Sequence, residues 1–79
     1  MPRYYFQLHN DIDVPDDEGK ELPDLNAACD WAACSARMVM GQTLKEEGTI
    51  SLKHRIDVED EQHAVLATVW FKDAVQVRG

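Results

Sequence analysis

Residues 23–48 read PDLNAACDWAACSARMVMGQTLKEEG, and this stretch predicts one long helix. The leading proline suits a first helical turn, because its missing N–H would have no partner there. Asp24 is suited to cap the helix or to complement its dipole, and Gly48 supplies the stop at the far end. The helix should begin at this Pro-Asp pair and run to about Glu46. Gly41 costs about 1 kcal/mol relative to alanine, so the helix could kink or end early there.

Two apolar stripes follow the predicted helix, which turns by about 100° per residue. The first stripe should pack on a sheet, and its alanines predict a close approach of the two layers. Its members are Leu25, Ala28, Cys29, Ala32, Ala36, Val39, Met40 and Thr43. Trp31, Cys34 and Met38 fall roughly opposite, on the face that should meet water. Burying a Trp and a Met typically stabilises a protein by several kcal/mol, so we expect this second stripe to contact a second copy or another partner. The alternative is an exposed Trp31 that lies along its own helix or is covered by the C-terminal tail.

Alternating apolar and polar residues predict strands on both sides of the helix. Residues 3–9 should form the first strand, and residues 54–60 and 64–71 should form a hairpin. Ile12 and Val14 could add a short strand that pairs loosely with the first. Because residues 64–71 are almost wholly apolar, that strand should be covered on both faces or centrally placed, and we expect it to be the central strand of the sheet.

The order of these elements predicts a two-layer α+β fold, β-(β)-α-β-β. A small, mainly antiparallel sheet of three to four strands should pack on the one long helix. The 79 residues fit a single domain, residues 1–79. A domain of this size is marginally stable alone, and self-association is one common remedy. Residues 72–77 could form a short terminal turn or strand.

The face of the sheet that points away from the helix should carry an exposed aromatic residue. If Phe71 meets the helix, then Trp70 points away, and the reverse phase exposes Phe71 instead. A dimer could therefore form sheet against sheet as well as through the helix stripe. The sequence leaves helix-side and sheet-side association open.

The charge balance restricts the classes of partner. A formal net charge of −7 repels phosphate, which argues against nucleic acid and against anionic membranes. One small basic spot, residues 53–55, does not offset it. No apolar run is long enough to span a membrane, and the N-terminus lacks a signal-peptide pattern, so we expect a cytoplasmic protein. Cys29 and Cys34 fit that compartment as free thiols, since they lie about 140° apart on the helix and cannot pair with each other.

An acidic rim precedes the helix. Its members are Asp11, Asp13, Asp16, Asp17, Glu18, Glu21 and Asp24. Clustered carboxylates suit Ca²⁺, but the spacing fails the EF-hand pattern, because Pro15 stands where the third ligand belongs and Asp16 stands where glycine is needed. We therefore expect no metal site. The rim should be a solvated surface or a contact for a basic protein.

No catalytic residue is expected. His9 and His54 stand at strand ends and His63 in a hairpin loop, so their convergence on zinc is not expected. No Cys, His and Asp set could activate a nucleophile. The sequence thus predicts neither an enzyme nor a cofactor.

A series of motifs spans nearly the whole chain. They are MPRYYF at residues 1–6, DDEG at 16–19, ELPDL at 21–25, VLATV at 65–69 followed by Phe71, and DAV at 73–75. In this order they resemble a family of short uncharacterised bacterial proteins, common in alphaproteobacteria. The resemblance implies a domain of unknown function with no assigned activity or ligand. Trp31, Cys34 and Met38 stand where that family is expected to carry Glu or Arg, and Trp70 stands where a smaller residue or proline is usual.

We therefore predict a non-enzymatic cytoplasmic interaction module that forms a homodimer. The predicted contact surface comprises Trp31, Cys34, Met38 and Trp70. The alternative is an acidic regulatory protein that binds a basic protein partner through residues 11–24.

Overall fold

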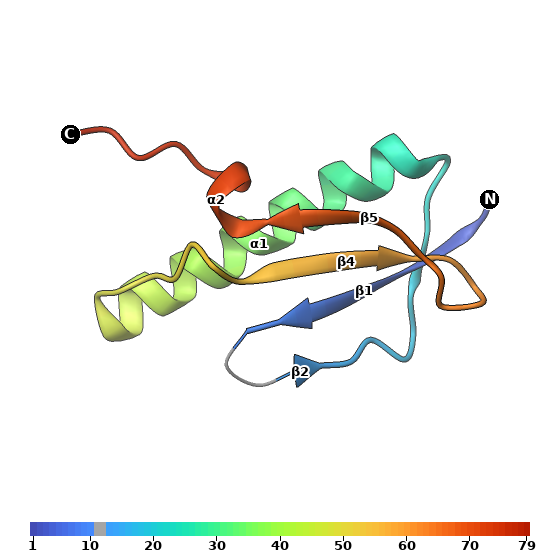
Figure 1. The fold of residues 1–79 in the computed structure, drawn as a ribbon, viewed down its shortest axis with the longest axis horizontal. Helices are drawn as coiled ribbons and strands as arrows, with labels where there is room; N and C mark the ends of the chain where they lie inside the picture. The colour runs from blue at the N-terminus through green and yellow to red at the C-terminus, as the bar shows by residue number, and fades with distance from the viewer. Residues whose placement is uncertain (11–12) are drawn as a thin grey trace.

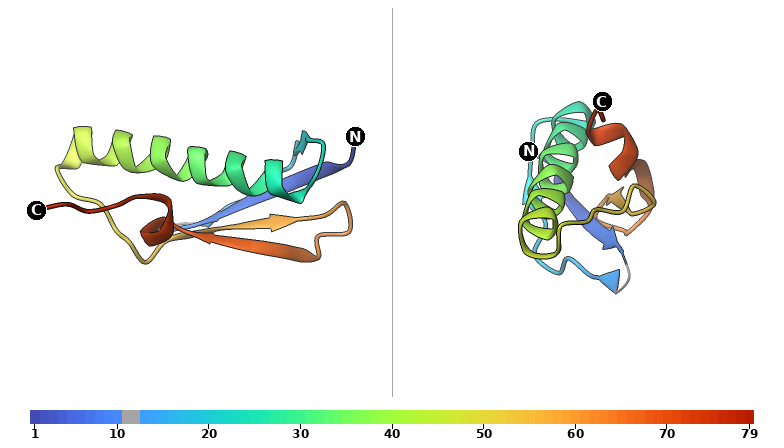
Figure 2. Two further views of the ribbon diagram at one scale, coloured as in Figure 1. Left: turned by 90° about the horizontal axis from the view of Figure 1, so that it is seen from above. Right: turned by 90° about the vertical axis from the view of Figure 1, so that its left-hand side faces the viewer.

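The computed structural model describes residues 1–10 and 13–79 and has two layers (Figures 1 and 2). An antiparallel sheet forms one layer, and the long helix α1 lies across one face of it. The elements are β1 Arg3–His9, β2 Asp13–Val14, β3 Lys20–Glu21, α1 Leu25–Glu47, β4 Arg55–Glu59, β5 Val65–Trp70 and α2 Phe71–Ala74. The predicted α+β class and the antiparallel sheet packed on one helix are confirmed. The two-residue strand β3 is an addition, and the short helix α2 replaces the end of the predicted strand at Phe71 and the start of the turn or strand predicted over residues 72–77.

Helix α1 begins and ends where the sequence predicts. The side chain of Asp24 caps it by accepting a hydrogen bond from the N–H of Ala27 at 2.8 Å. At the other end Gly48 adopts a left-handed φ of 73°, and its N–H donates to the carbonyl of Leu44. Gly41 does not interrupt the helix.

The strand order is β2-β1-β4-β5, with β3 pairing beside β2 on the same side of β1. The prediction that residues 64–71 form the central strand is therefore wrong, because β5 lies at one edge and β4 lies between β1 and β5. Strand β4 occupies an inner position in the sheet despite its charged residues, because these side chains contact side chains of the neighbouring strands. The predicted coverage of both faces of β5 is also wrong. Val65 is 55% exposed, Leu66 42% and Trp70 38%.

The core lies between α1 and the inner face of the sheet. Ala28, Ala32 and Ala36 are fully buried there, which confirms the predicted alanine contact between helix and sheet. Leu25 remains exposed at the start of the stripe. Phe71 is 1% exposed, so the phase of β5 that turns Trp70 outward is the correct one. The predicted short strand is found as β2 at Val14, whereas Ile12 lies outside the described residues.

Candidate functional site

The helix stripe of Trp31, Cys34 and Met38 lies on the side of α1 turned away from the sheet. Met38 is 72% exposed and Trp31 43% exposed, and Cys34 is an exposed free thiol. The Trp31 ring has a partner within its own chain, because the Lys20 ammonium lies 4.5 Å from the ring centroid. A cation over an indole face at this distance is favourable, so part of the Trp31 surface is already covered.

Trp70 belongs to a different surface. It pairs across the strands with Arg55, whose guanidinium carbon lies 5.7 Å from the indole centroid. Paired residues of an antiparallel ladder share a face, and this face is the one that α1 leaves open. The structure therefore does not bring Trp70 together with the Trp31 stripe, and one flat interface cannot contain both.

Strand β5 forms an open edge of the sheet. Within the described residues it pairs with β4 on one side and with no strand on the other. Alternate residues of an edge strand bond to the neighbouring strand, so the remaining N–H and C=O groups point outward. Its six residues, VLATVW, include no charged residue and no proline. A register shift between Val58 and Glu59 leaves Leu66 as the extra residue of a bulge.

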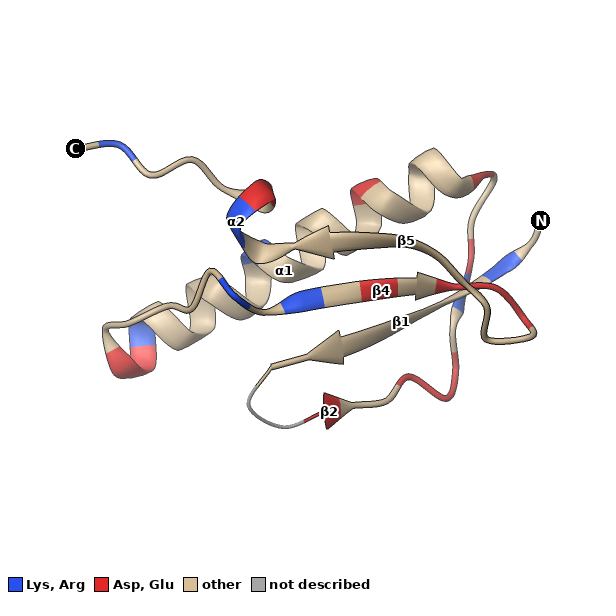
Figure 3. Ribbon diagram, in the orientation of Figure 1, with Lys and Arg blue, Asp and Glu red and all other residues tan. Residues whose placement is uncertain are grey.

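The two ends of β5 carry opposite charge (Figure 3). Its first residue, Val65, pairs with Glu59, and the acidic turn that contains Asp60 precedes it. Its last residue, Trp70, pairs with Arg55, and Lys72 and Asp73 follow in α2. The edge therefore runs from an acidic end to an end where Arg55 and Lys72 outnumber Asp73, with an apolar middle.

The acidic rim mostly serves the fold. The Asp16 carboxylate accepts hydrogen bonds from the backbone N–H groups of Phe6, Glu18 and Gly19 at 3.0–3.1 Å. Glu21 pairs with Arg3, and Asp24 caps α1. In addition, Asp13 contacts His9, while the predicted rim member Asp11 lies outside the described residues. Asp17 and Glu18 are exposed. Among the rim residues that the structure describes, no feature singles out a basic partner.

The open face of the sheet carries a polar network that the sequence does not predict. Asp57 on β4 is only 9% exposed, and its carboxylate contacts His9 Nε2 at 3.1 Å and accepts from the Thr68 hydroxyl at 2.8 Å. The other ring nitrogen of His9 lies 3.0 Å from Asp13. A second cluster joins Glu59 to Gln7 and His63. The register between neighbouring strands brings these groups together. The alternation of apolar and polar residues within one strand does not reveal that register.

The three histidines do not converge. His9 and His63 stand on the open face, whereas His54 lies edge-on to the buried Phe71 ring, at 5.6 Å between centroids. Across residues 1–10 and 13–79, no three His, Cys, Asp or Glu side chains are arranged to hold a metal ion. A search of the same residues finds no helix that is long and apolar enough to cross a membrane.

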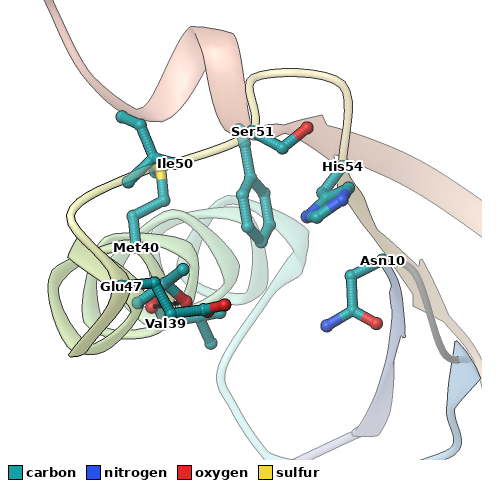
Figure 4. Close-up of a pocket in the computed structure, with 9 residues that line it drawn as sticks. Asn10, Val39, Met40, Glu47, Ile50, Ser51 and His54 are labelled. Carbon is teal, nitrogen blue, oxygen red and sulfur yellow. Dashed lines mark hydrogen bonds between the residues drawn. The ribbon is translucent and has the colours of Figure 1, made fainter.

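A cavity lies where the C-terminal half of α1 meets the segment before β4 (Figure 4). Its volume is about 250 Å³. Apolar and polar groups from four parts of the chain line it, and they are Asn10, Val39, Met40, Thr43, Glu47, Ile50, Ser51, His54 and Phe71. The sequence predicts Thr43 on the stripe that faces the sheet and His54 at a strand end, but nothing in the local pattern links the end of β1 to the end of α1.

Comparisons with curated proteins and with solved structures find no match to this chain. A family described as a domain of unknown function, DUF6894, matches residues 3–72. This match confirms the resemblance to an uncharacterised family that the series of motifs indicates. The chain belongs to this DUF6894 family of domains of unknown function.

Proposed function

We propose that this protein is a non-enzymatic interaction module that associates with a second copy of itself, and that the open edge of β5 makes the central contact. The observation that carries the proposal is the uncharged, proline-free edge of β5, with Val65, Leu66 and Trp70 exposed beside it. Edges of this kind are templates for pairing with another strand, and natural sheets usually protect them.

A second copy is the occupant that the charges of this edge favour. Two copies related by a two-fold axis pair their β5 strands antiparallel, which sets the acidic end of one strand against the basic end of the other. Asp60, in the turn before β5 of one copy, then approaches Lys72, which follows β5 of its partner. A parallel arrangement would oppose like charges at both ends. The apolar middle of the strand offsets the general repulsion between two chains of charge −7.

The helix stripe is the second surface for the same function. Its support is the large exposure of Met38. Lys20 already covers part of Trp31, and the helix offers no open backbone groups for a partner. We therefore rank the stripe below the edge of β5. The proposal also places the protein in the cytoplasm, since free thiols at Cys29 and Cys34 fit a reducing compartment.

Sedimentation equilibrium on matched lysine variants tests the proposal. The wild type should sediment at twice its 9.0 kDa chain mass. Leu66→Lys puts a charge on the β5 edge at an exposed position and should yield a folded monomer, with an unchanged circular dichroism spectrum. Met38→Lys puts the same charge on the helix stripe and should leave the dimer intact.

Each other outcome has a defined meaning. A wild type that stays monomeric up to millimolar concentration would overturn self-association itself. A dimer that survives Leu66→Lys but is lost in Met38→Lys would overturn the assignment to β5 and move the contact to the helix stripe. In that case the proposal of self-association would be retained, and the proposal that β5 makes the contact would be rejected.

A further inference from the structure

The cavity beside the end of α1 has an apolar floor and a rim of polar groups. Val39, Met40 and Phe71 belong to the core or pack against it, and Ile50 closes one side (Figure 4). Small-molecule sites typically combine such an apolar wall with a few polar groups that fix orientation. At about 250 Å³ the space suits a compact ligand that is smaller than a typical drug.

The polar groups on the α1 side of the cavity are hydrogen-bond acceptors. The Thr43 hydroxyl already donates to the carbonyl of Val39 at 2.9 Å, so it can offer only its lone pairs to a ligand. Glu47 adds a carboxylate, which has no hydrogen-bond or ion-pair partner within the described part of the chain. Both stand in the last turns of α1, where the helix dipole adds negative potential.

We propose that this cavity binds a small organic cation, a protonated amine carried on an apolar group. The ammonium donates to the Glu47 carboxylate and the Thr43 hydroxyl, and the apolar group packs on Phe71 and Val39. Anionic ligands of the same shape are rejected by Glu47, by the helix dipole and by the net charge of −7. This proposal is independent of self-association.

Titration followed in amide ¹H–¹⁵N spectra tests the proposal with two probes of similar shape and opposite charge. 2-Phenylethylammonium should shift the signals of residues that line the cavity, whereas 3-phenylpropionate should leave them unchanged. Glu47→Gln removes the charge and should weaken binding of the ammonium by about tenfold, the usual scale for one charge-assisted hydrogen bond.

Glu46→Gln is the matched control, because Glu46 is the neighbouring carboxylate but bonds to Gln42 away from the cavity. It should weaken binding less than twofold, since it removes the same formal charge without removing a ligand group. Three results would overturn the proposal: no shifts with the ammonium at millimolar concentration, equal binding of the two probes, or equal losses in Glu46→Gln and Glu47→Gln. The last result would reduce the effect to general attraction by an acidic chain.

Discussion

The two edges of the sheet are built in opposite ways. On one side of β1, the edge is broken into the two-residue strands β2 and β3, separated by Pro15 and the acidic segment that follows. On the other side β5 runs for six residues without a charge or a proline. Short strands, prolines and charges are the devices by which natural sheets prevent pairing with another chain. One edge of this molecule carries all three, and the other carries none of them, its one such irregularity being the bulge at Leu66.

Asp16 stabilises the edge formed by β2 and β3, which we call the protected edge, in the gap between these two strands. Its carboxylate accepts the N–H of Phe6, which neither β2 nor β3 reaches, and its backbone N–H donates to the Gln7 side chain at 2.9 Å. A side chain thus takes the place of a missing strand. An edge of this sheet can therefore be closed without a continuous strand. The edge of β5 stays open because of the residues that form it, and the fold itself does not require an open edge there.

The largest effect on the protected edge should come from Gly19→Ala. Gly19 has a φ of +68°, and an added Cβ would stand 2.8 Å from the carbonyl oxygen of Tyr4. Backbone strain and this clash together should lower the free energy of unfolding by about 3 kcal/mol. Urea denaturation at one fixed protein concentration measures the change. A loss below about 1 kcal/mol would show that the edge relaxes around the added methyl group.

A smaller loss is expected from Asp16→Ala, which removes the acceptor for three backbone N–H groups. The N–H of Phe6 is partly buried, so leaving it without a partner should cost about 2 kcal/mol. Asp17→Ala is the control, since its neighbouring side chain is exposed and should change stability by less than about 0.5 kcal/mol. Equal melting temperatures for the two variants would contradict the structural role of Asp16.

The smallest effect, and one of opposite sign, should come from a glycine remote from both edges. The Cβ added in Gly41→Ala has no described atom within 4 Å apart from the neighbouring helix backbone, and the substitution should stabilise α1 by about 0.5–1 kcal/mol. Gly48→Ala, at a φ of +73°, should instead destabilise the protein by about 1 kcal/mol. If thermal unfolding gives the same sign for both, the helical state of Gly41 or the left-handed cap at Gly48 is wrong.

The sequence predicted the helix and the inner layer well, because these depend on local signals. Asp24 and Gly48 mark the ends of α1, and the spacing of alanines marks the face that packs on the sheet. The order of the strands was not predictable in this way, because an almost wholly apolar strand is typical of a central position and β5 lies at an edge. The charges of Arg55 and Asp57 hid the central place of β4, because Asp57 contacts His9 and Thr68 on the neighbouring strands and Arg55 lies over Trp70.

The candidate sites follow the same division. The exposure of Trp31 and Met38 was predictable from the helical period, whereas the contact of Lys20 with Trp31 was not, because it joins β3 to α1. The cavity beside Glu47 depends on four segments meeting, and no local pattern encodes that meeting.

The position of β1 between its partners has a kinetic consequence. On one side it pairs with segments that follow it closely in the chain, and on the other side with β4, where Gln7 and Glu59 are 52 positions apart. The near side can form by closing a short loop, while the far side must wait until α1 and β4 have been brought back to it. Folding should therefore proceed from the protected edge toward β5. Until β4 docks, β1 itself is the exposed edge in a folding chain, and the speed of that long closure sets how long it stays open.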